Sequence, residues 1–226
     1  MLKRIREDPL WLFDISNPKA LLVVAHADDE TIFAGGLILS SCKTEWTIIC
    51  CNPQGDIREK EFRSACQFLS EKSRNSIMPV LLNPIRKHNW DIEKIPPEQL
   101  KPYAKGYNFV LTHNQEGEYG NEDHREVHRA VLDSIGNSNT WVFLSSGSSN
   151  IAHHTQKALR SRKPGGNFML PLSPEIRRLK IEAFQECHTS QAKEYGYVDG
   201  KLRNSQLKET LKWEFESGRE EYAFYK

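Results

Sequence analysis

Four ionisable side chains stand within five residues, directly after a short apolar run. The run is Ala20 to Ala25, and His26, Asp28, Asp29 and Glu30 follow it. Carboxylates in the first turn of a helix complement its dipole, and one of them can cap the helix. That interpretation accounts for Asp28 or Asp29 but leaves His26 unexplained. A histidine and a carboxylate at this spacing favour a metal site, with the second aspartate acting as a base.

A second polar cluster, residues 113 to 124, begins at the end of another apolar run. It closes with Asp123 and His124, and His128 follows one turn later on an apolar helical stripe, which favours a core position for His128. An acid beside a metal-bound histidine commonly orients the imidazole. Joined with His26 and an aspartate, the clusters offer two nitrogens and one oxygen, a donor set that suits zinc with an open position for water.

Apolar runs that alternate with helical periods predict the elements that position these clusters. Strands are expected at residues 20–25, 46–51, 78–82, 108–112 and 140–144, and helices over 62–69, 124–135 and 176–187. Short continuous apolar runs are typical of strands that are buried on both faces of a parallel sheet. We therefore predict an α/β, Rossmann-like fold, with a mostly parallel sheet and helices on both faces. Ligands of such sheets bind beyond the carboxyl ends of the strands, where both clusters are expected.

Two segments are expected to stand outside this alternation. Residues 145 to 172 are rich in Ser, Gly, Lys and Arg and predict a long loop, with one short helix around 151–160. Residues 215 to 226 are expected to form a final edge segment or tail. A length of 226 residues allows one large domain or two small ones, and we expect a single domain over 1–226.

Composition argues against several classes of protein. Lys and Arg number 31 against 30 Asp and Glu, a balance that gives no field for holding nucleic acid or an anionic membrane. No apolar run approaches the roughly 20 residues of a transmembrane helix, and the segment from Met1 to Asp14 lacks the apolar region of a signal peptide. The 5 cysteines include no Cys-x-x-Cys pair, which argues against a disulfide framework and favours a cytoplasmic location.

The first cluster resembles a known motif. The segment Ala25 to Glu30 (AHADDE) closely resembles the AHPDDE motif of the PIG-L/LmbE-like zinc-dependent N-deacetylases, with Ala27 in place of the proline. Residues 117 to 124 resemble the second motif of this family, usually Gly-His-x-Asp/Asn-His. Further similarities are a Gly…Arg loop and a late K-x-x-A…S-Q signature, at Gly55, Arg58, Lys180, Ala183, Ser190 and Gln191. The resemblance runs from residue 20 to about 191.

The resemblance implies a Rossmann-like hydrolase that removes the acetyl group of an N-acetylated amino sugar, often a glucosaminide. One Zn²⁺ per chain and a small-molecule substrate are implied with it. The roles carried over are metal binding by His26, Asp29 and His124, base catalysis by Asp28, orientation of a neighbouring histidine by Asp123, and substrate binding by Arg58. Tyr119 borders this site and is expected to stack on a sugar ring.

One position departs from the family pattern. Asn121 stands where the family commonly has a histidine that polarises the carbonyl or protonates the leaving amine. Asparagine can donate a hydrogen bond to an oxyanion, but it cannot deliver a proton. Asp28 would then serve as both base and acid, or His128 or His188 would help, or the enzyme would be slow or inactive.

Two other functions fit part of the pattern. A phosphoesterase or another metal hydrolase would use the same metal, although such enzymes usually need more carboxylates. A degenerate family member would bind a sugar without hydrolysing it. A dinucleotide cofactor is not expected, because no G-x-G-x-x-G follows the first strand and an acid pair there would repel a pyrophosphate. The oligomeric state stays open.

Overall fold

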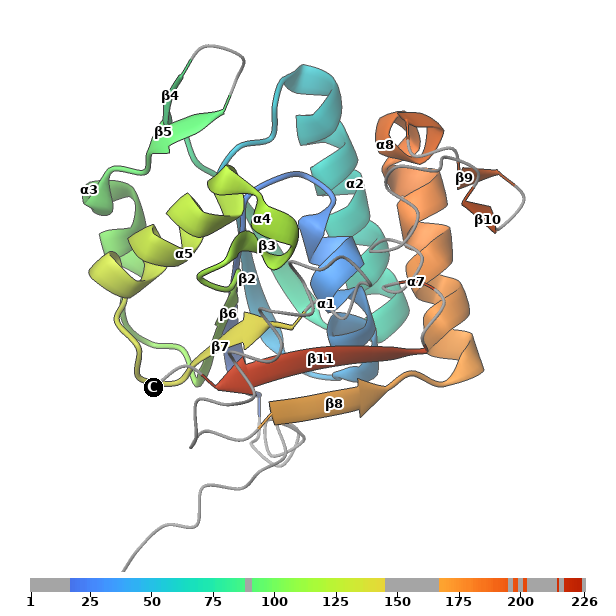
Figure 1. The fold of residues 1–226 in the computed structure, drawn as a ribbon. Coiled ribbons are helices and arrows are strands. Elements are labelled where there is room, and N and C mark those ends of the chain that lie inside the picture. The colour runs from blue at the N-terminus through green and yellow to red at the C-terminus, as the bar shows by residue number, and fades with distance from the viewer. Residues whose placement is uncertain are drawn as a thin grey trace, which may run out of the picture.

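Seven strands pair into one sheet in the order β3-β2-β1-β6-β7-β11-β8 (Figure 1). The structure, a computed structural model, describes residues 17–87, 91–144, 167–194, 197–198, 201–202, 215 and 218–224. The strands of this sheet are β1 (Lys19–Val24), β2 (Glu45–Cys50), β3 (Ser76–Leu81), β6 (Phe109–Thr112), β7 (Thr140–Phe143), β8 (Asn167–Pro171) and β11 (Arg219–Phe224). The first five named are parallel, so the predicted α/β fold with a mostly parallel sheet is confirmed.

Helices cover both faces of the sheet (Figure 1). They are α1 (Asp29–Ser40), α2 (Asp56–Ser73), α3 (Pro97–Leu100), α4 (Gly117–Gly120), α5 (Glu122–Ser134), α7 (Pro174–Cys187), α8 (Thr189–Glu194) and a 3₁₀ turn (Lys101–Tyr103). Two short ribbons complete the described elements, β4 (Ile85–Arg86) with β5 (Ile92–Lys94) and β9 (Tyr197–Val198) with β10 (Lys201–Leu202). Among the described residues, no helix combines the length and the apolarity that a membrane span requires.

Strand β1 divides the hydrophobic interior into two cores. Leu22 and Val24 point to the side where α1, α2 and α7 pack against one another. Leu21 and Val23 point to the opposite side, which α5 covers. A strand whose alternate residues enter two cores must be apolar throughout, and this explains the unbroken run that predicted it.

The end of the chain corrects one prediction. Strand β11 is not an edge segment, because it pairs antiparallel with β7 on one side and with β8 on the other. Its two acidic residues, Glu220 and Glu221, are buried, and this polarity concealed a central strand. The predicted loop over 145–172 ends in the edge strand β8, and residues 145–166, with the predicted short helix, lie outside the described residues.

The strand order reverses direction beside β1. Strand β2 follows β1 in the chain and lies on one side of it, whereas β6 lies on the other side. Such a switch point opens a crevice at the carboxyl ends of the two strands. His26 follows β1 and the 113–124 segment follows β6, so the topology delivers both polar clusters to this crevice.

Candidate active site

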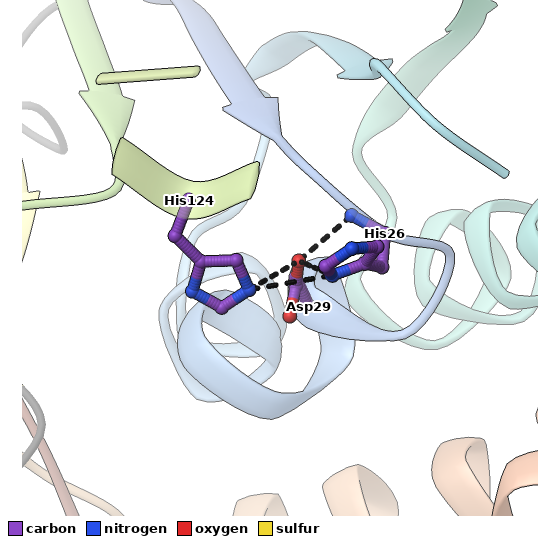
Figure 2. Close-up of side chains that lie close together, drawn as sticks. All are labelled: His26, Asp29 and His124. Atoms are coloured by element: carbon purple, nitrogen blue, oxygen red, sulfur yellow. Dashed lines mark hydrogen bonds and ion pairs between the residues drawn. The ribbon is translucent and has the colours of Figure 1, made fainter. Parts of the chain in front are cut away.

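The two predicted clusters meet at this crevice. His26 after β1, Asp29 at the start of α1 and His124 in the first turn of α5 converge from three segments (Figure 2). Oδ2 of Asp29 lies 3.4 Å from His26 Nδ1 and 3.4 Å from His124 Nε2, and the two nitrogens are 3.3 Å apart. All three side chains are almost fully enclosed by the protein.

The outer nitrogen of each imidazole is held by a carboxylate. Asp123 Oδ2 lies 3.0 Å from His26 Nε2, and Glu118 Oε2 lies 2.6 Å from His124 Nδ1. Burial raises the pKa of both carboxyl groups, but hydrogen bonds and charges of their neighbours outweigh burial. The histidines lower the pKa of Glu118 to about 2, and His26, Ile92 and Asn52 together lower that of Asp123. Ionised carboxylates can only accept hydrogen bonds, so the outer nitrogens carry the protons. Carboxylate–histidine pairs of this kind orient metal-binding imidazoles.

The inner atoms of this cluster fit a cation. With the outer nitrogens hydrogen-bonded to carboxylates, the inner nitrogens of His26 and His124 face each other and Asp29. Burial lowers the pKa of both histidines, but nearby carboxylates raise it by a larger amount, so a positive charge from a proton or a metal ion is favoured here. Burial raises the pKa of Asp29, yet the imidazoles hold it well below its usual range. Two nitrogens and one carboxylate oxygen within 4.8 Å of one another suit zinc with an open position.

Asp123 orients His26 and not the histidine that follows it in the sequence. Consecutive residues of a helix point about 100° apart, so the side chains of Asp123 and His124 diverge. The Asp123 carboxylate instead accepts hydrogen bonds from His26 Nε2, from Asn52 Nδ2 at 3.2 Å and from the Ile92 backbone N–H at 2.8 Å. The hairpin β4–β5 is thereby tied to the same carboxylate as the candidate ligand.

Sequence reasoning assigned no role to two buried residues of this site, His113 and Glu118. Nδ1 of His113 lies 2.8 Å from Glu118 Oε2, and its Nε2 accepts the Ala25 backbone N–H at 3.0 Å. The same Nε2 is 3.4 Å from Asp29 Oδ2. One available signal was the position of His113 at the carboxyl end of a strand, where ligand-binding residues gather in such sheets.

Asp28 faces Arg58 rather than capping α1. Its backbone carbonyl accepts the first N–H groups of the helix, but its carboxylate makes no cap bond and lies 3.0 Å from Arg58 Nη2. The same Nη2 donates to the Ala27 carbonyl at 3.0 Å. Burial raises the pKa of Asp28 more than Arg58 lowers it. Arg58, which was expected to hold substrate, therefore holds the predicted base next to Asp29.

Asn121 caps helix α5. Its Oδ1 accepts hydrogen bonds from the backbone N–H groups of Asp123 at 2.9 Å and His124 at 3.3 Å. Asparagine is a preferred residue at this position because its side chain satisfies N–H groups that have no partner within the helix. The cap fixes the turn that carries Asp123 and His124, and it leaves the amide nitrogen as the donor that a substrate could meet.

Removal of this cap is expected to cost stability. Asn121→Ala should lower the free energy of unfolding by about 1 kcal/mol, because two backbone N–H groups lose their acceptor. Asn121→Ser retains a side-chain acceptor and should cost no more than about 0.5 kcal/mol. Urea denaturation of the metal-free protein measures both values. Equal losses in the two variants would contradict the capping role.

Three further residues were singled out from the sequence. The side chain of Tyr119, expected to stack on a sugar ring, lies outside the described part. His128 is a buried residue of α5, and its Nδ1 donates to the His113 carbonyl at 2.8 Å. His188 ends α7 and forms a buried pair with Glu30, at 2.8 Å from Nε2 to Oε1. His128 is thus a hydrogen-bonded core histidine, as the apolar stripe around it indicates.

A family model and a curated relative match this chain. The PIG-L model, described as GlcNAc-PI de-N-acetylase, matches residues 21–135, just over half of the chain. An uncharacterised protein of Acanthamoeba polyphaga mimivirus is 26% identical over 140 residues, which cover 54% of this chain and 60% of that protein. The chain thus spans less than two thirds of the length of this relative.

Several solved structures share the fold. The pseudoaglycone deacetylase Dbv21 is 14% identical with a TM-score of 0.56 over 93% of this chain and 99% of that one. The zinc-inhibited form of teicoplanin deacetylase Orf2 is 15% identical with a TM-score of 0.53, over 91% and 97% of the two chains. At these identities the likeness shows the fold alone. The family model, however, spans the first motif and the second, and the chain belongs to the PIG-L family.

Proposed function

We propose that this protein is a zinc-dependent de-N-acetylase. It would hydrolyse the N-acetyl group of an amino-sugar-containing small molecule or glycoconjugate precursor, releasing acetate and a free amine. The observation that carries the proposal is the convergence of His26, Asp29 and His124 at the switch point of the sheet, with Asp28 beside them. Membership of a family described by a de-N-acetylase supports the reaction type.

Each part of the reaction has a candidate group. When bound by His26, Asp29 and His124, zinc would polarise the amide carbonyl and make a water molecule acidic near neutral pH. Asp28 would take the proton of the attacking water, since Arg58 fixes its carboxylate beside the ligands. The amide nitrogen of Asn121 would donate to the substrate oxyanion.

The proton that Asp28 accepts also completes the reaction. As the water oxygen bonds to the carbonyl carbon, the carbon–nitrogen bond breaks and the proton passes from Asp28 to the amine nitrogen. Burial already raises the pKa of Asp28, so its carboxyl group can hold a proton for this purpose. A single carboxylate then acts as base and acid, and Asn121 need not deliver a proton.

The setting proposed for this enzyme is a single domain over residues 1–226 in the cytoplasm. The five cysteines are free thiols, four of them buried, and this supports a reducing compartment. A small N-acetylated substrate is proposed as the partner. The names of the solved relatives, deacetylases of teicoplanin and of a pseudoaglycone, support acetylated compounds as the class to screen.

Metal content and acetate release test the proposal together. Elemental mass spectrometry should find about one zinc per chain in the wild type and none in His124→Ala, because two ligands hold zinc far less tightly than three. His128→Asn, one turn along α5, keeps a donor for the His113 carbonyl and should retain zinc. The wild type should release acetate from N-acetylglucosaminides. A wild type that binds no supplied zinc would overturn the proposal, and zinc binding without acetate release would favour another metal hydrolase.

A further inference from the structure

We propose that Glu118 is a positioning residue that fixes the proton arrangement of two imidazoles with one carboxylate oxygen. It would thereby decide which nitrogen of His124 faces the metal. The inference rests on the proposed zinc site, which it deepens. Glu118 would act through the candidate ligand His124 and would not bind the metal itself.

Both oxygens of the Glu118 carboxylate have hydrogen-bond partners. Oε1 accepts the backbone N–H of Asn114 at 2.9 Å. Oε2 lies 2.8 Å from His113 Nδ1 and 2.6 Å from His124 Nδ1. An ionised carboxylate has only lone pairs to offer, so both Nδ1 atoms must carry hydrogen. The Nε2 atom of His124 is then left with the lone pair that a metal needs.

The same argument removes a competing ligand set. His113, Glu118 and His124 also lie close enough to hold an ion. The Nδ1 atoms of His113 and His124 are both hydrogen-bonded to Glu118, so an ion that bound them would have to displace two hydrogens. The Glu118 carboxylate therefore favours the set that contains His26 and Asp29.

His113 supports His124 without being a ligand. The two rings stack with centroids 3.8 Å apart and planes 25° apart. Its Nε2 accepts the Ala25 backbone N–H at 3.0 Å, and the same atom lies 3.4 Å from Asp29 Oδ2. Hydrogen on Nδ1 matches the contact of this ring with Glu118, and a lone pair on Nε2 matches the hydrogen bond from Ala25.

The backbone conformation around Glu118 places its carboxylate beside the imidazoles of His113 and His124. Glu118 has a φ of 53°, in the left-handed region that L residues other than glycine, Asn and Asp seldom adopt. The side chain of Asn114 holds the loop in this shape, because its Oδ1 accepts the N–H groups of Glu116 at 2.8 Å and Glu118 at 3.3 Å. Strained backbone that persists at a buried site is expected where the position of the side chain matters.

Zinc affinity tests whether Glu118 positions His124 or has no effect on the metal site. Competition with a chelator should show zinc bound about 10- to 100-fold more weakly by Glu118→Gln than by the wild type, because a glutamine cannot accept both Nδ1–H groups and the Asn114 N–H. Glu116→Gln is the matched control, since its partly exposed carboxylate lies two residues away in the same loop. It should bind zinc as the wild type does. Wild-type affinity in Glu118→Gln would overturn the inference.

A second measurement needs no substitution and no metal. Nitrogen-15 NMR of the metal-free wild type should show hydrogen on Nδ1 of both His113 and His124. An unprotonated Nδ1 in either ring would overturn the inference, even if Glu118→Gln failed to fold. If the wild type bound no zinc, the proposed function would fail, while protonated Nδ1 atoms would still support the control of these imidazoles by Glu118.

Discussion

Asp28→Asn is expected to lower kcat for acetate release by about 100- to 10,000-fold while zinc stays bound. An amide cannot accept the proton of water, and the substitution removes the group proposed to return that proton to the amine. The contacts among the candidate ligands His26, Asp29 and His124 should persist, because the Asp28 carboxylate pairs with Arg58. KM should change far less than kcat, since the lost interaction acts in the transition state.

The measurement pairs steady-state kinetics with the zinc content of each protein. Asp56→Asn is the matched control, because this exposed aspartate lies in the first turn of α2, two residues before Arg58. It makes the same chemical change near the same arginine and should keep wild-type kcat. A near-normal kcat in Asp28→Asn would show that another group is the base.

The convergence of the candidate metal ligands could be predicted because their positions follow from topology. His26 and Asp29 come directly after one buried strand, and the 113–124 segment follows the strand beside it. In a parallel sheet the carboxyl ends of neighbouring strands lie at one edge, so a sequence that predicts both strands also predicts that these side chains meet. The alternative in which the Asp28 side chain caps α1 does not hold, because its carboxylate makes no cap bond and pairs with Arg58 of α2. Nothing in the local sequence shows that Arg58 reaches this position.

The carboxylates that contact the candidate ligands could not be predicted from topology in this way. Glu118, which contacts His124, has a positive φ, and a tetrapeptide such as Gly-Glu-Tyr-Gly does not specify that conformation. Asp123 reaches His26 across the crevice, although His124 is its neighbour in the chain. Local spacing predicts which residues share a helix face, but it does not predict partners from separate segments.

Lys180, the first residue of the late K-x-x-A…S-Q signature, has a structural role that could not be predicted from the sequence. Lys180 pairs with Glu220 at 2.7 Å, and each side chain is 1% exposed. The Glu220 carboxylate also accepts the backbone N–H groups of Gly36 at 2.7 Å and Leu37 at 2.8 Å, in the middle of α1. A Cβ atom at Gly36 would lie 2.8 Å from Glu220 Cδ, so only glycine admits this approach. The ion pair joins α7, α1 and β11.

Lys180→Met is therefore expected to lower the free energy of unfolding by about 3–5 kcal/mol, because it leaves the Glu220 carboxylate buried without its counter-charge. For a chain of this size the melting temperature should fall by roughly 10 °C. Urea denaturation gives the first value and calorimetry the second. The more accessible pair of Lys72 with Glu182, 4.0 Å apart and 42% and 26% exposed, supplies the control, and Lys72→Met should change stability by less than about 0.5 kcal/mol.

A double variant tests whether the unpaired charge of Glu220 causes the loss of stability. Lys180→Met combined with Glu220→Gln should be more stable than Lys180→Met alone, because the amide removes the unpaired charge while its oxygen still accepts one N–H group of α1. If the loss came only from altered packing around Lys180, the second substitution would add to the damage. A single variant within about 1 kcal/mol of the wild type would contradict the argument, since breaking a buried pair in this way typically costs several kcal/mol.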